Sequence, residues 1–190
     1  MMRSTAAWLC ATMVMLTACA SPTLVTPGPF QVGGTRVNVS REWSDISGIM
    51  PDAAKKVRLL SIDGPLLNRL YITDELSPGD VFVRPPSRER PTPVLREGMS
   101  PSERMEFVTD NVVALGYQRV ERLNPKPTRY LGAPAIRFEI DAQTPEGLDI
   151  SGLAVVSAVG DRVRILLYLA PSEHYFAASL QDVEAVILSP

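Results

Sequence analysis

Histidine and cysteine, two residue types that often act in catalysis, are rare in this sequence. One of its 190 residues is a histidine, His174, and two are cysteines, Cys10 and Cys19. His174 could serve as the general base of a Ser-His-Asp triad, but no Gly-x-Ser-x-Gly turn presents a serine nucleophile. We therefore expect a structural or exposed role for His174, no catalytic residues and no enzymatic activity.

Metal and cofactor sites have equally little support. We expect the N-terminal segment with Cys10 to be removed and Cys19 to be lipidated, as argued below. One histidine and no free cysteine would then remain, which excludes a zinc site built from His and Cys. The acids Asp74, Glu75 and Asp80 are the nearest approach to a calcium loop, and they lack its alternating spacing. The sequence also contains no phosphate-binding Gly-Lys-Ser/Thr loop and no dinucleotide-binding glycine pattern. We expect no metal and no cofactor.

Three polar residues lie close together in the segment 63–69, which reads DGPLLNR. Asp63, Asn68 and Arg69 could converge at one end of a sheet and bind a polar ligand. In the structural alternative, Asp63 caps a turn, Gly64 supplies a positive φ, and Asn68 and Arg69 flank the next strand. The turn chemistry favours this alternative, and the three residues remain candidates for ligand binding.

The other candidate is a run rich in arginine and proline, residues 84–96. It contains four arginines and four prolines in thirteen residues. This composition predicts a stiff cationic surface segment that could dock onto anionic headgroups, lipopolysaccharide phosphates or an acidic partner. The alternative, which loop composition favours, is a solvated connection kept soluble by its charge.

The elements that position these residues follow strand and helix periodicities. Residues 136–141 alternate strictly between apolar and charged, which indicates a half-buried strand. A helix over 101–115 begins with the capping signature of Ser100 and Glu103 and ends at Gly116. A second amphipathic helix covers 176–187. Further strands are expected over 30–40, with a bulge at Gly33-Gly34, and over 57–63, 66–73, 148–159 and 163–169. The expected fold class is α+β, an antiparallel sheet flanked by helices.

The N-terminal residues follow the pattern of a secretory signal. Arg3 precedes about eleven mostly apolar residues, too few for a membrane-spanning helix. The sequence Leu16-Thr17-Ala18-Cys19 resembles the lipobox of bacterial lipoproteins. That resemblance implies removal of residues 1–18 and acylation of Cys19, which would anchor the protein in a membrane. The alternative is an ordinary secretory signal in which Cys19 has no role.

The predicted boundaries follow from this signal. Residues 1–18 form the signal peptide, and residues 19–29 form a lipidated cysteine followed by a proline-rich tether able to extend about 30 Å. Residues 30–190 form a single α+β domain. Removal of the signal leaves one cysteine, so no disulfide can form within the chain. Ala20 resembles the residue found after the cysteine in outer-membrane lipoproteins, and an inner-membrane location remains the alternative.

Composition excludes one large class of partner. The net charge is −2 and the isoelectric point is about 5.5. Nucleic-acid binding requires a basic surface that neutralises phosphates, and the chain has no basic excess. We therefore expect no nucleic-acid partner.

The order of the expected elements resembles the PsbP-like α/β/α sandwich. Segments 60–71 and 170–176 are similar to those of a group of proteobacterial lipoproteins. Members of the fold group mostly bind or support larger assemblies, so the resemblance implies a non-enzymatic module. The leading hypothesis is a lipid-anchored, periplasm-facing binding or scaffolding module with an envelope protein partner, held in the outer membrane through Cys19. The alternatives are a carrier with a cleft for a small molecule or lipid and, with less support, a hydrolase using His174.

Overall fold

The computed structural model describes residues 21–189, which form ten strands and two helices. Residues 1–20, including the predicted signal peptide and Cys19, lie outside the described residues. The elements are β1 (Thr23–Val25), β2 (Gly28–Val32), β3 (Thr35–Val39), β4 (Trp43–Asp45), β5 (Val57–Ser61), β6 (Arg69–Thr73), α1 (Pro101–Ala114), β7 (Gln118–Tyr130), β8 (Ala133–Gln143), β9 (Asp149–Val159), β10 (Arg162–Pro171) and α2 (Tyr175–Leu188). Neither helix within residues 21–189 is long and apolar enough to cross a bilayer.

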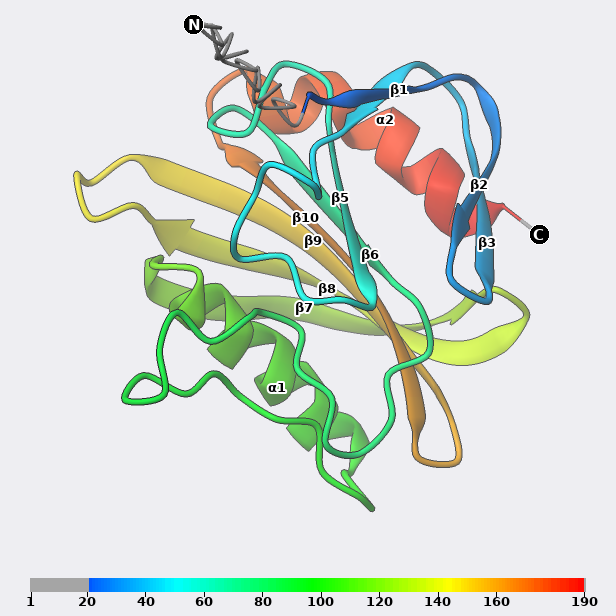
Figure 1. Ribbon diagram of the computed structural model, residues 1–190, viewed down its shortest axis with the longest axis vertical. Coiled ribbons are helices and arrows are strands. Elements are labelled where there is room, and N and C mark those ends of the chain that lie inside the picture. Colours follow the sequence, from blue (N-terminus) through cyan, green and yellow to red (C-terminus); the bar gives the residue numbers. More distant parts are fainter. Residues whose placement is uncertain (1–20, 190) are drawn as a thin grey trace, which may run out of the picture.

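Eight strands form one antiparallel sheet in the order β1-β4-β5-β6-β10-β9-β8-β7. Helix α1 and the long connection between β6 and α1 cover one face, and α2 covers the other together with the β2–β3 hairpin (Figure 1). The predicted α+β class with a flanked antiparallel sheet is confirmed.

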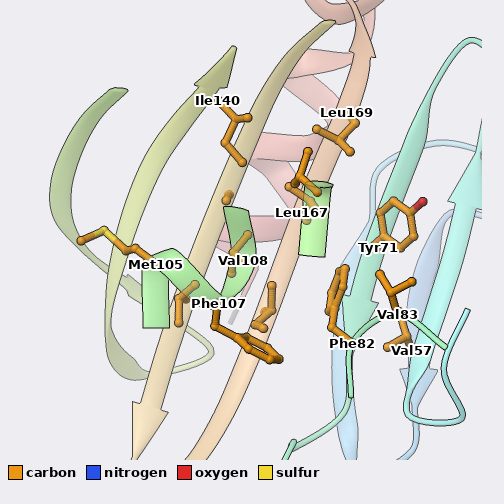
Figure 2. Packing of buried hydrophobic residues seen from close by; sticks show 14 of the residues in the cluster. Val57, Tyr71, Phe82, Val83, Met105, Phe107, Val108, Ile140, Leu167 and Leu169 are labelled. Atoms are coloured by element: carbon orange, nitrogen blue, oxygen red, sulfur yellow. The ribbon is translucent and has the colours of Figure 1, made fainter. Parts of the chain in front are cut away.

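The central strands are apolar on both faces because both faces are covered. In β10, Ile165 and Leu167 pack toward α1, whereas Leu166 and Tyr168 pack toward α2. Figure 2 shows the α1 side, where Phe107 and other helix residues pack against the sheet. Burial on both faces explains why β9 and β10 read as almost continuous hydrophobic runs.

Helix α1 begins and ends where the sequence predicts. Ser100 is the N-cap and forms a reciprocal capping box with Glu103. The apolar stripe places Met105, Val108 and Val112 in the core. These local signals agree with the tertiary packing, which explains why the prediction of this helix is accurate.

The tether predicted over residues 19–29 is corrected from Thr23 onward. Residues Thr23–Val25 form β1, which pairs with β4, and Val25 is buried opposite Trp43. The prolines flank β1 and leave its three residues free to pair, so the segment joins the edge of the sheet. Residues 23–29 therefore belong to the folded domain and do not form the extended spacer predicted for them.

Two further details differ from the expectation. Gly33-Gly34 is the two-residue turn of the β2–β3 hairpin instead of a bulge. Strand β6 begins at Arg69, later than the expected Leu66, because residues 62–68 form a longer turn.

Candidate functional site

The turn between β5 and β6 is built around the buried side chain of Asn68, which is 1% exposed. The Asn68 amide oxygen accepts hydrogen bonds from Ser61 Oγ (2.8 Å) and from the backbone N–H groups of Ile62 (2.8 Å) and Asp63 (3.3 Å). Its Nδ2 donates to Asp63 Oδ2 at 2.7 Å. Gly64 adopts a φ of 107°, which other residues rarely reach. The polar groups of Asn68 are therefore used inside the turn.

No hydrogen bond or ion pair among the described residues joins Arg69 to Asp63 or Asn68, and Arg69 instead holds two connections together. Its Nε donates to the carbonyl oxygen of Pro65 at 2.5 Å, and its Nη1 lies 4.0 Å from Asp52 Oδ2. The buried hydroxyl of Tyr71 lies in the same electrostatic cluster. Burial raises the Tyr71 pKa well above its usual value, and the nearby Arg69 guanidinium only partly opposes this rise. Tyr71 thus stays neutral, and Arg69 is the counter-ion of the Asp52 carboxylate.

The three candidate ligand-binding residues therefore have separate surroundings. Asp63 and Asn68 bind each other within the turn, and Arg69 binds the backbone and Asp52. This geometry favours the structural alternative for all three. The β5–β6 turn emerges as a rigid feature instead, and it carries Leu66 at its exposed tip.

The cationic segment, residues 84–96, is fastened to the domain at both ends. The backbone N–H of Arg84 donates to the carbonyl oxygen of Asp52 at 2.9 Å, and Thr92 Oγ1 donates to the carbonyl oxygen of Val83 at 2.6 Å. Near the C-terminal end, the N–H of Leu95 donates to the carbonyl oxygen of Asp80 at 2.9 Å. These bonds hold the base of the segment against the α1 face of the sheet.

One of these anchor points depends on a polar side chain in the core. Asn111 of α1 is fully buried, and its Oδ1 accepts a hydrogen bond from the N–H of Val83 at 3.3 Å. Its Nδ2 donates to the carbonyl oxygen of Phe107 at 2.7 Å. The sequence places Asn111 in the helix but gives no signal of its partner, because that partner lies 28 residues away.

Three arginines of the cationic segment, one at its start and two at its tip, carry exposed, unpaired positive charge. Arg84, Arg88 and Arg90 are all exposed, and none of them forms an ion pair with another residue of the described chain. A surface cavity of about 450 Å³ lies among Pro85, Ser87, Arg88 and Pro91. A guanidinium group can bind a carboxylate or phosphate through two parallel hydrogen bonds. This tip is therefore the candidate functional site.

The acids once considered for calcium, Asp74, Glu75 and Asp80, each have a protein partner. The partners are the N–H of Gly34 for Asp74, Arg162 and Arg164 for Glu75, and Lys56 for Asp80. Within residues 21–189 no three histidine, cysteine or acidic side chains are grouped so as to hold a metal ion. These carboxylates join separate loops of the domain.

His174 lies exposed immediately before α2, with a φ of 67°. Its ring meets the Tyr175 ring edge-on at a centroid distance of 5.2 Å. No hydrogen bond joins its side chain to a serine in the part of the chain described here. The geometry offers no support for a nucleophile–base pair at this position.

A polar groove of about 520 Å³ crosses the ends of β7, β8 and β9. Its charged residues are Arg119, Glu121, Asp141 and Asp149. Strand β7 is irregular here, with a register shift between Gln118 and Glu121 and a φ of 49° at Arg119. The groove could not be predicted from the sequence, because the residues of β7 show no apolar alternation.

Comparisons with known proteins establish the fold. No family model matches this sequence, and no curated protein matches it. The chain is similar in structure to the Ran-binding protein Mog1p of Saccharomyces cerevisiae, at 10% identity over 86% of this chain and 84% of that chain, with a TM-score of 0.51. It is also similar to the cyanobacterial PsbP (CyanoP) of Synechocystis sp. PCC 6803, at 14% identity over 91% and 93% of the chains, with a TM-score of 0.51. The chain therefore has the Mog1/PsbP-like fold, as the resemblance in element order predicts.

Proposed function

We propose that this protein is a lipid-anchored binding module of the bacterial cell envelope. In this proposal Cys19 holds it in the outer membrane facing the periplasm, and it has no enzymatic activity. The cationic segment would contact an acidic surface of a partner protein. The observation that carries the proposal is the exposed, unpaired charge of Arg84, Arg88 and Arg90 on a segment whose base is fixed by hydrogen bonds.

A fixed base favours binding because less conformational entropy is lost when the partner docks. The arginines supply planar donor groups that match carboxylates, and the Pro85–Pro91 cavity supplies an apolar surface beside them. The rest of the chain carries a negative net charge, so the segment is a local feature and not part of a general basic surface. An acidic protein partner fits this combination of charge and shape.

Binding is tested by crosslinking the envelope in cells that carry the tagged protein, followed by affinity capture and mass spectrometry. The test variant replaces Arg84, Arg88 and Arg90 with serine. The matched control replaces three exposed arginines of β7 with serine, so that the change in charge is the same. These arginines are Arg119, Arg122 and Arg129. We expect one acidic partner to be captured by the wild type and the control and lost from the test variant. Equal capture by all three proteins, or no reproducible partner, would contradict the proposal.

The anchor is tested separately. Globomycin, which inhibits the lipoprotein signal peptidase, should cause the unprocessed precursor to accumulate, and radiolabelled palmitate should enter the product. The C19S variant should lose both responses. Normal maturation in the presence of globomycin would contradict the anchoring and indicate a freely diffusing protein. The outcome of the binding test does not depend on this result.

A further inference from the structure

The anchor proposed at Cys19 lies very close to the folded domain. Strand β1 begins at Thr23, so Ala20, Ser21 and Pro22 are the only residues between the cysteine and the sheet. Fully extended, the chain spans about 14 Å between the Cα atoms of Cys19 and Thr23. The polar headgroup layer of one leaflet is about 5–8 Å thick. The first strand therefore cannot be lifted far above the headgroups, in contrast to a tether of about 30 Å.

The strand register identifies the part of the domain that this short connection holds down. Leu24 of β1 pairs with Ser44 of β4, and Ser44 pairs with Ser61 of β5. Residues directly opposite each other in a sheet point to the same face, and β1 lies two strands, about 10 Å, from β5. Leu24 and Ser61 therefore lie in one row across this corner of the domain.

Ser61 connects this row to the β5–β6 turn. Its Oγ donates to Asn68 Oδ1 at 2.8 Å and accepts from the N–H of Gly64 at 2.9 Å. Figure 1 shows the start of β1 and the β5–β6 turn together at the upper end of the sheet. Leu66 at the tip of this turn thus lies at the same corner as Leu24.

Both leucines expose most of their surface to solvent. Leu24 is 62% exposed on an edge strand, and Leu66 is 82% exposed at the tip of a turn that five hydrogen bonds to Asn68 and Ser61 make rigid. A rigid turn presents its apolar tip without losing further conformational entropy on contact. When exposed apolar side chains next to an acyl anchor enter the headgroup boundary, the burial of their apolar area strengthens membrane binding.

We propose that β1 and the β5–β6 turn form the membrane-facing surface of this protein, with Leu24 and Leu66 in the headgroup region of the bilayer that holds the acyl chains. This inference rests on the anchoring at Cys19. It fixes the orientation of the domain and makes the anchor a two-point attachment, through lipid and protein together.

The test uses the mature, acylated protein in phosphatidylcholine vesicles. Because the sulfur of an acylated Cys19 is blocked as a thioether, a single introduced cysteine carries the environment-sensitive fluorophore NBD. The probe sites are L24C and L66C. The controls are V159C and L188C, which match them in exposure at 62% and 78%. Val159 lies at the β9–β10 turn, at the opposite end of β10 from the residues that pair with the start of β6.

We expect a blue shift of NBD emission at positions 24 and 66, and loss of that emission when nitroxide-labelled lipids are included. Positions 159 and 188 should give the spectrum of a probe in water. A protein that floats with the vesicles but gives water-like spectra at positions 24 and 66 overturns this inference and leaves the anchor intact. A blue shift without nitroxide quenching indicates contact with a second copy and also overturns it. A protein that does not float with the vesicles overturns the anchoring and this inference with it.

Discussion

Gly33 lies directly against the carboxylate of Asp74. A Cβ atom at Gly33 would lie 2.0 Å from Asp74 Oδ2, and the residue has a φ of 57°. The same carboxylate accepts hydrogen bonds from the N–H of Gly34 at 3.0 Å and from Thr35 Oγ1 at 3.2 Å. The turn of the β2–β3 hairpin, which belongs to a separate two-stranded sheet, is thereby fastened beyond the end of β6 in the large sheet.

Replacing Gly33 with alanine should destabilise the domain by at least about 2 kcal/mol, because the positive φ costs about 1–2 kcal/mol and the clash with Asp74 adds to it. Urea denaturation of the non-acylated domain measures this. G34A is the matched control, since a Cβ there would lie at an ordinary 3.5 Å from Asp74 Oδ1. The double variant G33A/D74A should recover the part of the lost stability that is due to the clash. Equal destabilisation by G33A and G34A would contradict the contact.

Acid should weaken the domain through the Asp74 carboxylate. Burial raises the pKa of Asp74, but hydrogen bonds from the backbone of Glu75 and Gly34 and from Thr35 outweigh it, and the net pKa is lowered. A carboxyl group whose pKa is lower in the folded state stabilises fully above its unfolded pKa, about 3.9, and loses this contribution as the pH falls through its folded value.

Urea midpoints measured between neutral pH and the acid limit should therefore fall below about pH 4 in the wild type. D74N should be less stable at neutral pH and show a flatter decline in acid. D141N, at an exposed position on β8, serves as the control. Wild-type and D74N curves of the same shape would show that Asp74 does not carry this effect.

Asn68 should matter for stability more than for ligand binding. N68A removes a buried side-chain oxygen that accepts three hydrogen bonds within the turn, which we expect to cost about 2–4 kcal/mol. D63A removes one acceptor at an exposed position and should cost less than about 1 kcal/mol. Chemical denaturation compares the two variants. An unchanged free energy of unfolding in N68A would contradict the structural role and favour a ligand-binding role for Asn68.

The sequence was informative wherever local pattern and tertiary packing agree. The Ser100–Glu103 capping box and the alternation of residues 136–141 correctly located α1 and β8. Strand β7 escaped prediction because it is mostly exposed, carries two prolines and has bulges at Arg119 and Asn124, so it shows no apolar period of two. Its pairing with β8 decides its structure, and that partner is not visible in its own residues.

The site residues follow the same division. The exposure and charge of the cationic segment could be predicted from its composition, but its attachment through Asn111 and Thr92 could not, since both bonds depend on contacts across the fold. Likewise the sequence suggested that Asp63, Asn68 and Arg69 could converge, while the pairing of Arg69 with Asp52, 17 residues earlier in the chain, could not be predicted from it. Spacing along the chain predicts turns and does not predict contacts between distant loops.

The rigidity of the cationic segment can be tested by proteolysis. Thr92 is buried, and T92V keeps its shape while removing the 2.6 Å hydrogen bond to the carbonyl oxygen of Val83. Losing this bond should lower the free energy of opening the segment by about 1 kcal/mol and speed cleavage about fivefold. Trypsin cleaves poorly before proline, which protects Arg84 and Arg90, so Arg88 is the expected cleavage site within the tip.

Mass spectrometry of timed trypsin digests measures the rate of cleavage after Arg88. T109V is the control, because Thr109 Oγ1 donates to the carbonyl oxygen of Glu106 at 2.9 Å, a bond of the same kind but within α1. We expect the rate in T109V to match the wild type. This anchor keeps the loss of conformational entropy on docking small. T92V should therefore also weaken partner capture in the crosslinking test, although every arginine stays in place. Rapid cleavage of the wild type at Arg88, equal to that of T92V, would mean that the tip is mobile and that its charge alone recruits the partner.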